Sequence, residues 1–200
     1  MKAKIAIFAS GSGTNFEAIA EACADGRVAA EPVLMVCDKA GAKVIERAER
    51  RGIETFVFSP KDYPSKADFE REIVALLEAR GVELVCLAGY MRLIGEVLLE
   101  AYGGRIINIH PSLLPSFKGA HAIRDAFEYG VKVYGVTIHY VDASLDGGRI
   151  IAQRAFSYEG SDIDELESMI HAVEHELYPE TVNKLIQNSE FKIQNFLNLL

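Results

Sequence analysis

The first hundred residues alternate between short apolar runs and segments of helical periodicity, and this alternation restricts the fold more than any other feature. The predicted strands are residues 4–9, 32–37, 53–58 and 82–88, and the predicted helices are residues 15–24, 42–51 and 65–80. Gly52 and Gly81 stand where the second and third helices end, and Ser65 is a candidate cap for the start of the third. Because the strand segments are apolar almost throughout, we expect a parallel sheet that helices cover on both faces.

The pattern changes after residue 100. The predicted elements there are strands at residues 105–109, 134–141 and 149–157 and helices at residues 120–129 and 161–178. The last two strands have no helix between them, so we expect them to pair antiparallel and to extend the parallel sheet. Ser161 is a candidate cap for the last helix, Pro179 predicts a bend or break in it, and residues 180–200 give no clear assignment. The predicted fold class is therefore α/β, with a Rossmann-like, mostly parallel sheet, antiparallel strands added in the C-terminal half, and helices on both faces.

Length and composition indicate one globular domain. The chain has 200 residues, of which 50% are hydrophobic and 25% are charged. This length suffices for one core and is short for two independent domains. We therefore expect a single domain over residues 1–200, whose two halves share one continuous sheet.

The net charge and the cysteines bear on partners and on location. A net charge of −8 opposes binding to nucleic acid and to anionic membranes, so an anionic ligand would need backbone N–H groups or one or two local cations. The three cysteines have no metal-type spacing and lie in apolar stretches, as expected for buried thiols in a reducing cytosol. With no signal-peptide pattern and no apolar run long enough to span a bilayer, we expect a cytoplasmic protein.

The run Asn-Ile-His-Pro-Ser-Leu-Leu-Pro at residues 108–115 follows an apolar strand and carries candidate catalytic groups. Asn108 and His110 share one face of an extended strand, and Asp146 follows later in an Asp-Gly-Gly turn. An amide N–H can stabilise an oxyanion, an imidazole can move protons near neutral pH, and a carboxylate can orient that imidazole. These are the groups that an acyl-transfer site needs. The alternative is that Asn108 and His110 only cap a turn before Pro111.

A glycine-rich loop, Ser-Gly-Ser-Gly-Thr-Asn at residues 10–15, joins the first predicted strand to the first predicted helix. Phe16 stands where a dinucleotide fingerprint needs its third glycine, and no Lys-Ser/Thr pair follows as in a P-loop. Because N–H groups at a helix N-terminus bind anions, the loop predicts a site for a single phosphomonoester. The alternative is a tight turn that uses glycine for its backbone freedom. The expected phosphate contacts are Gly11, Ser12, Gly13, Thr14 and Asn15.

Taken in order, these motifs resemble those of the folate-dependent formyltransferases, and among them the phosphoribosylglycinamide formyltransferases. The segment Leu-Ala-Gly-Tyr-Met-Arg-Leu at residues 87–93 resembles the folate side of that family, and Glu174-His175 before Tyr178-Pro179 resembles its substrate-binding helix. Methionyl-tRNA formyltransferases carry an extra C-terminal domain, and formyltetrahydrofolate hydrolases carry an extra N-terminal one. Three departures are Val44-Ile45 in place of a common Gly-Leu pair, Gly147 in place of a common threonine, and an unmatched tail from Asn188 to Leu200.

The resemblance implies that the formyl group of 10-formyltetrahydrofolate, the co-substrate, passes to the amine of glycinamide ribonucleotide. The products would be tetrahydrofolate and formylglycinamide ribonucleotide, in de novo purine biosynthesis, with no metal. Asn108 would donate to the oxyanion, His110 would stabilise it and deliver a proton, and Asp146 would sustain the charge of His110 and accept the amine proton. Residues 1–100 would form the phosphate-binding half, and residues 101–200 the catalytic and folate-binding half.

The resemblance also implies the binding residues. Glu174 would hold the substrate, and His121 would support catalysis near Asp146. The implied folate contacts are Met91, Arg92, Leu93, Val141, Asp142, Ala143, Ser144 and Leu145. Core packing is the alternative for Met91 and Leu93. The other histidines are expected to be non-catalytic: His139 as a structural strand residue, and His171 and His175 on a helix face rather than as metal ligands.

The expected partners are the two small-molecule substrates alone, without nucleic acid or membrane, and the chain is expected to be a monomer or homodimer. Two other functions stay open. One is formyl transfer to another amine, such as an amino sugar nucleotide, which would not demand a phosphomonoester. The other is a phosphometabolite- or folate-binding module without turnover, which would not need Asn108, His110 and Asp146 together.

Overall fold

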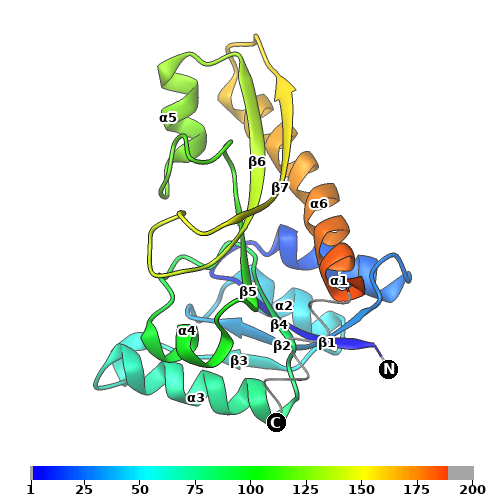
Figure 1. The fold of residues 1–200 in the computed structure, drawn as a ribbon, viewed down its shortest axis with the longest axis vertical. Helices are drawn as coiled ribbons and strands as arrows, with labels where there is room; N and C mark the ends of the chain where they lie inside the picture. Colours follow the sequence, from blue (N-terminus) through cyan, green and yellow to red (C-terminus); the bar gives the residue numbers. More distant parts are fainter. Residues whose placement is uncertain (1, 189–200) are drawn as a thin grey trace.

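A computed structural model describes residues 2–188 and contains the predicted α/β sheet (Figure 1). The strands are β1 (Ala3–Phe8), β2 (Ala30–Cys37), β3 (Thr55–Val57), β4 (Leu84–Leu87), β5 (Ile106–His110), β6 (Val133–Tyr140) and β7 (Ile150–Ser157). The helices are α1 (Thr14–Ala24), α2 (Lys43–Arg50), α3 (Lys66–Ala79), α4 (Glu96–Tyr102), α5 (Ala122–Tyr129) and α6 (Ile163–Gln187), with a short 3-10 helix η1 (Pro60–Asp62). Of the tail left without an assignment, residues 189–200 lie outside the described residues.

The sheet joins both halves of the chain. Its strand order is β3-β2-β1-β4-β5-β6-β7. The strands from β1 to β5 are parallel. Strands β6 and β7 pair antiparallel, as the sequence predicted, and β6 also runs antiparallel to β5. In Figure 1, β6 and β7 extend away from the parallel strands, and α6 lies along them. The predicted fold class is confirmed.

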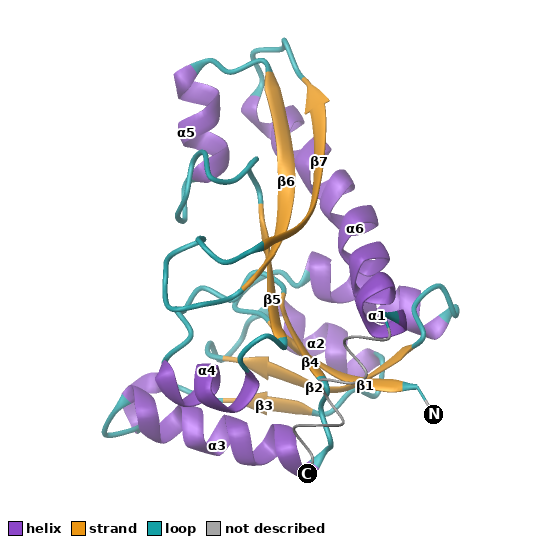
Figure 2. Cartoon of the chain, in the orientation of Figure 1, coloured by secondary structure: helices purple, strands orange, loops and turns teal. Residues whose placement is uncertain are grey.

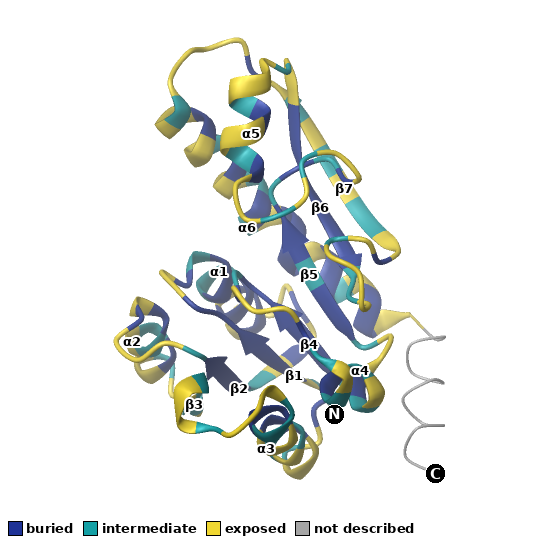
Figure 3. Cartoon of the chain, turned by 90° about the vertical axis from the view of Figure 1, so that its left-hand side faces the viewer, coloured by how far each residue is buried: buried dark blue, intermediate teal, exposed yellow. Residues whose placement is uncertain are grey.

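Helices cover both faces of the sheet (Figure 2). Along β1, Ile5 and Ile7 pack into one core with α1, α2, α5 and α6, whereas Ala6 and Phe8 pack into a second core with α3 and α4. This alternation is the strand's period of two, and it explains why a strand between two helical layers is apolar at nearly every position. Figure 3 shows the buried strands between helices whose outer faces are exposed.

Two predictions at helix starts have different outcomes. Ser65 is the N-cap of α3, and its hydroxyl accepts a hydrogen bond from the backbone N–H of Asp68 at 3.3 Å. For α6, the prediction of Ser161 was wrong by one residue. Asp162 is the cap, because its carboxylate accepts from the N–H groups of Asp164 and Glu165. A carboxylate caps well and also complements the positive end of the helix dipole.

Two further differences concern helix extent. Helix α4 was not predicted. Its start at Gly95 is stabilised by a distant residue, since the Gly95 N–H donates to the buried Glu70 carboxylate of α3 at 2.6 Å. Helix α6 does not break at Pro179 but continues to Gln187, because Tyr178 and Val182 on either side are fully buried and keep the helix packed. Among residues 2–188, no helix is long and apolar enough to cross a membrane.

Candidate active site

The candidate site lies where the parallel strands end. Strands β1 and β4 are neighbours, but the chain leaves β1 toward β2 and leaves β4 toward β5, on opposite sides. Such a switch point opens a crevice at the carboxyl ends of the strands, where open α/β sheets bind ligands. The glycine loop follows β1, and the segment at residues 87–93 spans the end of β4. On β5, Asn108 lies in the middle of the strand and His110 is its last residue. The fold therefore brings the three predicted motifs to one edge.

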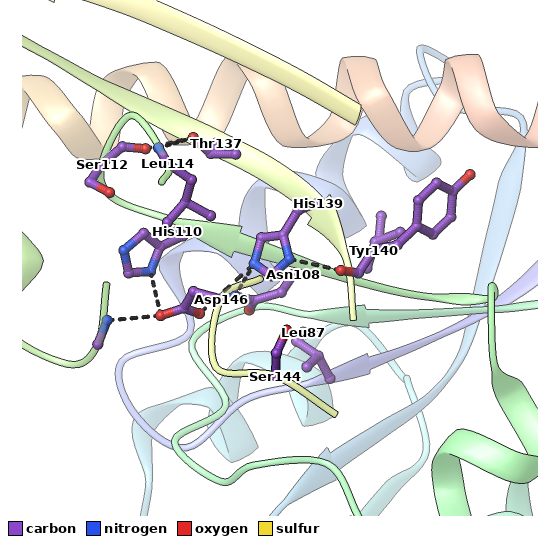
Figure 4. Close-up of polar contacts among 12 residues, drawn as sticks. Leu87, Asn108, His110, Ser112, Leu114, Thr137, His139, Tyr140, Ser144 and Asp146 are labelled. Carbon is purple, nitrogen blue, oxygen red and sulfur yellow. Dashed lines mark hydrogen bonds and ion pairs between the residues drawn. The ribbon is translucent and has the colours of Figure 1, made fainter. Parts of the chain in front are cut away.

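Asn108, His110 and Asp146 are brought together, with their side chains turned toward one another (Figure 4). The Nδ1 atom of His110 lies 3.6 Å from Oδ2 of Asp146. The other ring nitrogen, Nε2, donates to the backbone carbonyl of Phe117 at 2.8 Å. A carbonyl can only accept, so this bond fixes a proton on Nε2 and turns Nδ1 toward the carboxylate. The 3.6 Å separation is an ion-pair distance rather than a hydrogen bond.

The turn that carries Asp146 is tightly constrained. Asp146 itself has φ +46°, a left-handed conformation that Asp tolerates better than most residues. Its Oδ2 accepts from the Gly119 N–H at 2.8 Å. Gly148 is buried, and a Cβ there would collide with the carbonyl of Tyr140. Phe117, the partner of His110, also has a positive φ, so two strained residues hold the His110–Asp146 geometry.

His139, predicted to be structural, lies inside this cluster. Its Nδ1–H donates to the Tyr140 carbonyl at 2.8 Å, so its Nε2 is the acceptor for the Asn108 Nδ2 amide at 3.2 Å. The same Nε2 lies 3.9 Å from Oδ1 of Asp146. Burial lowers the pKa of His139 below the usual 6.5, which keeps the ring neutral and able to accept. No local pattern in the sequence indicates this role, because the contact joins β5 to β6.

The glycine loop opens helix α1 as predicted. Gly13 has φ +73°, and a Cβ there would lie 2.6 Å from the side chain of Val44, one of the departures from the family pattern. Asn15 is buried, and its Nδ2 donates to Oε2 of Glu174 on α6 at 2.9 Å. Its Oδ1 is buried and has no partner among residues 2–188. An orphaned buried acceptor is costly, so it favours a ligand that donates a hydrogen bond there.

Arg47 on α2 is a residue at the loop that sequence reasoning missed. Its Nε donates to the backbone carbonyl of Ser12 at 2.8 Å, and its Nη1 lies 3.6 Å from a carboxylate oxygen of Glu17. Arg47 thus brings a cation to the loop of an acidic protein. No spacing in the sequence indicates this contact, because it depends on how α2 packs beside the loop.

Comparisons with known proteins decide the family. A family model described as formyl transferase matches residues 3–182. The chain is 53% identical over 184 residues to a phosphoribosylglycinamide formyltransferase of Bacillus subtilis (strain 168), which covers 92% of the chain and 94% of that protein. The chain belongs to the formyltransferase family. The resemblance inferred from the motifs is confirmed.

Two other similar proteins support the same family assignment. The crystal structure of glycinamide ribonucleotide transformylase 1 from Geobacillus kaustophilus superposes with a TM-score of 0.91 at 55% identity, covering 93% of the chain and 100% of that chain. The trifunctional purine biosynthetic protein adenosine-3 of Gallus gallus is 42% identical over 179 residues, which is 89% of the chain and 18% of that protein. The match to the larger protein is therefore to one part of it.

The predicted folate segments of the formyltransferase are exposed beside the site. Met91 is 72% exposed and Leu93 is 65% exposed, so core packing is wrong for both. Arg92 forms an ion pair with Asp38, with 2.6 Å between Nε and Oδ2. In the loop at residues 141–145, Val141 packs against the core cluster of α3 and α4, and the other four residues are exposed.

Among the described residues, the side chains of the remaining histidines form no hydrogen bond or ion pair with Asn108, His110 or Asp146. His121 is exposed at the N-cap of α5, and within residues 2–188 no hydrogen bond or ion pair joins its side chain to Asp146. His171 pairs with Glu174 at 2.9 Å, and that hydrogen bond raises the pKa of His171. Its ring stacks on His175 with centroids 6.3 Å apart. The described residues contain no group of three or more potential metal ligands.

Proposed function

We propose that the chain transfers the formyl group of 10-formyltetrahydrofolate to the amine of glycinamide ribonucleotide, as a step of de novo purine biosynthesis. The observation that carries the proposal is the convergence of Asn108, His110 and Asp146 at the end of β5, in a chain of this family. A binding module would not need an amide, an imidazole and a carboxylate held together by two strained turns.

The proposed chemistry has three steps. The substrate amine attacks the formyl carbon, a C–N bond forms, and the carbonyl oxygen becomes an oxyanion. Asn108 donates to this oxyanion, and protonated His110 stabilises it. Asp146 sustains the charge on His110 and takes the amine proton, directly or through water. The bond from the formyl carbon to the folate nitrogen then breaks, and that nitrogen receives a proton delivered by His110.

The proposed phosphate site uses the backbone N–H groups of the glycine loop at the start of α1, with Ser12 and Thr14 as side-chain donors. Arg47 supplies positive charge through its bond to the loop. Beyond the phosphate, the orphaned Oδ1 of Asn15 and the carboxylate of Glu174 are acceptors for the hydroxyl or amine groups of the substrate. The proposed phosphate contacts all lie within residues 1–100, the half of the domain that is expected to bind phosphate.

The proposed folate site lies between Met91, Arg92 and Leu93 and the loop at residues 141–145. Exposed apolar side chains at Met91, Leu93 and Leu145 offer a surface to the pterin, and Arg92 offers a cation to the carboxylates of the glutamate tail. We further propose a cytoplasmic location and small-molecule partners alone. Three buried free cysteines and a net charge of −8 support this part of the proposal.

The test is formyl transfer from 10-formyltetrahydrofolate to glycinamide ribonucleotide, measured as formation of tetrahydrofolate. We expect wild-type turnover and a fall in kcat of about 1,000-fold or more in Asp146→Asn, because that change removes the charge that stabilises protonated His110. Asp62→Asn, an exposed aspartate in η1, is the matched control and should behave as wild type. Near-normal turnover by a folded Asp146→Asn protein would remove Asp146 from the mechanism.

Assays with two other acceptors distinguish the proposed reaction from formyl transfer to another amine. Glycinamide riboside lacks the phosphate, so it should be a far poorer substrate than the ribonucleotide. An amino sugar nucleotide should not react at all. A folded wild-type protein that formylates the sugar nucleotide but not glycinamide ribonucleotide would establish the other amine as the acceptor.

A further inference from the structure

Asp38 has no part in the chemistry above, yet it is the centre of a network of short hydrogen bonds at the switch point. It follows β2 directly, and its side chain is only 9% exposed. One carboxylate oxygen accepts from the Ser10 hydroxyl at 2.5 Å, and the other accepts from Nε of Arg92 at 2.6 Å. The Ser10 Oγ in turn accepts from the Met91 N–H at 2.9 Å. The donors thus run in one direction, from Met91 through Ser10 to Asp38, with Arg92 as the second donor.

This network joins two loops that the chain path separates. Ser10 begins the glycine loop after β1, whereas Met91 and Arg92 belong to the segment after β4. At the switch point the connections from β1 and β4 leave in opposite directions, so no covalent path of short length ties the loops together. The tie is provided by Asp38, by the Ser10–Met91 bond and by one backbone bond from the Ser10 N–H to the Gly89 carbonyl at 3.0 Å.

The geometry of Arg92 indicates what Asp38 does there. Asp38 engages only Nε, and within residues 2–188 the two terminal nitrogens of Arg92 have no hydrogen-bond partner. The guanidinium is planar, so fixing Nε fixes the direction in which the terminal nitrogens point. The side chain is 41% exposed, which leaves those nitrogens accessible to a second carboxylate that binds bidentately.

We propose that Asp38 is a positioning residue that couples the two substrate sites, by orienting Arg92 for a folate carboxylate while holding Ser10 at the phosphate loop. This inference rests on the proposed function. A folate carboxylate that orders Arg92 also orders Asp38, and through it the Ser10 end of the glycine loop. Coupling between two sites is reciprocal, so binding of the phosphorylated substrate must favour binding of the folate by the same factor.

Asp38→Asn is the direct test, because it keeps the size of the side chain and changes only its donors and acceptors. An amide has one oxygen and one NH2 group, so it can accept from Ser10 or from Arg92 but must present its own donors to the other. We expect the KM for 10-formyltetrahydrofolate to rise about 10-fold, the scale on which hydrogen bonds to charged groups contribute. We expect kcat to stay within about threefold, because Asp38 touches no reacting atom.

The coupling is measured by binding of glycinamide ribonucleotide with and without saturating tetrahydrofolate. In the wild type we expect the folate to tighten nucleotide binding by about fivefold or more, and in Asp38→Asn we expect the ratio to fall to about one. Ser10→Ala should also abolish the ratio while raising the folate KM less, since it leaves the Asp38–Arg92 pair in place. Glu54→Gln is the matched control. It breaks another carboxylate–arginine pair, with Arg80, that lies on the exposed surface, and it should leave both quantities unchanged.

A readout without substrates separates this inference from the proposed function. Loss of the network should speed hydrogen exchange at the amides of residues 88–95 in Asp38→Asn but not in Glu54→Gln. Wild-type protein that fails to formylate glycinamide ribonucleotide would overturn the proposed function, whereas the exchange result still tests the tie between the loops. Unchanged exchange and an unchanged folate KM in Asp38→Asn would overturn the inference. So would a loss of thermal stability with the binding ratio intact, which indicates a structural role only.

Discussion

Two imidazoles flank the Asp146 carboxylate, and their backbone hydrogen bonds give them opposite ring orientations. The Nε2–H group of His110 donates a hydrogen bond to the Phe117 carbonyl, so Nδ1 faces Asp146. His139 uses Nδ1–H for the Tyr140 carbonyl, so Nε2 faces Asp146 and Asn108. Each carbonyl selects one tautomer, and the selection decides which ring can accept a hydrogen bond from the Asn108 amide. At the scale of single residues, the backbone thus assigns the side-chain roles.

This assignment predicts a role for His139 in orienting Asn108. In His139→Leu the Asn108 amide loses its acceptor, so we expect kcat to fall about 10-fold or more with little change in either KM, because Asn108, the proposed oxyanion donor, is no longer held. His139→Gln can restore an acceptor through its Oε1 and should recover part of the rate. Steady-state kinetics of both variants test the prediction, and wild-type kcat in folded His139→Leu would contradict it.

Helix α6 is the element that ties the halves of the sheet to the site. Glu174 binds Asn15 at the start of α1. One turn later, the fully buried Tyr178 hydroxyl lies 2.9 Å from the carbonyl of Leu87 on β4 and 3.2 Å from that of Ile107 on β5. Leu87 is the first residue of the predicted folate segment at residues 87–93, and Ile107 directly precedes Asn108. The helix therefore fixes the spacing of two site-bearing strands from behind.

Removal of this hydroxyl should affect stability first and catalysis second. For Tyr178→Phe we expect a loss of about 1 kcal/mol, because a buried hydrogen bond disappears while the ring still fills its site. That loss corresponds to a fall in melting temperature of about 2–4 °C for a chain of this size. Tyr63→Phe removes a hydroxyl that donates to Glu72 at the exposed surface, and it should change neither quantity. Equal melting temperatures for the two variants would contradict the role given to Tyr178.

At the scale of the whole molecule, local patterns predicted the strands, their direction and most helices. They did so because a strand buried between two helical layers is apolar along its length, and a surface helix repeats its apolar face. Local patterns did not predict helix α4, because its stabilising contact comes from Glu70, which lies 25 residues before Gly95 in the sequence. The prediction that α6 bends or breaks at Pro179 was wrong, because tertiary packing outweighed the local effect of proline.

The residues of the candidate site were also predictable only in part from the sequence. Asn108, His110 and the glycine loop stand in compact motifs, so the sequence alone indicated them. Arg47 and Asp38 act through contacts between elements that only the folded sheet brings together, 35 residues from Ser12 in the first case and 54 from Arg92 in the second. Residue type and spacing carry no information about such contacts, whereas the topology of the sheet determines them.

The histidines also set how the stability of the whole molecule varies with pH. Burial lowers the pKa of His139 and of His175 from 6.5, so the unfolded chain binds more protons than the folded one as the pH falls below about 6.5. Their contribution to stability is complete above that pH and is lost as the pH falls through the folded pKa values. His171 has the opposite sign, because Glu174 raises its pKa: its contribution is complete below pH 6.5 and is lost as the pH rises through the raised value.

We therefore expect the free energy of unfolding of the wild type, from urea titrations between pH 5 and 8, to fall as the pH drops below 6.5, whereas His171 adds stability as the pH drops from 8 to 6.5. His171→Gln removes that gain, so its net loss of stability from pH 8 to pH 5 should exceed that of the wild type. His139→Gln removes one of the two groups that cause the decline and should flatten the curve. Parallel curves for all three proteins would mean that neither His139 nor His171 titrates differently in the folded and unfolded chain. That result would contradict the neutral state of His139 as the acceptor for Asn108.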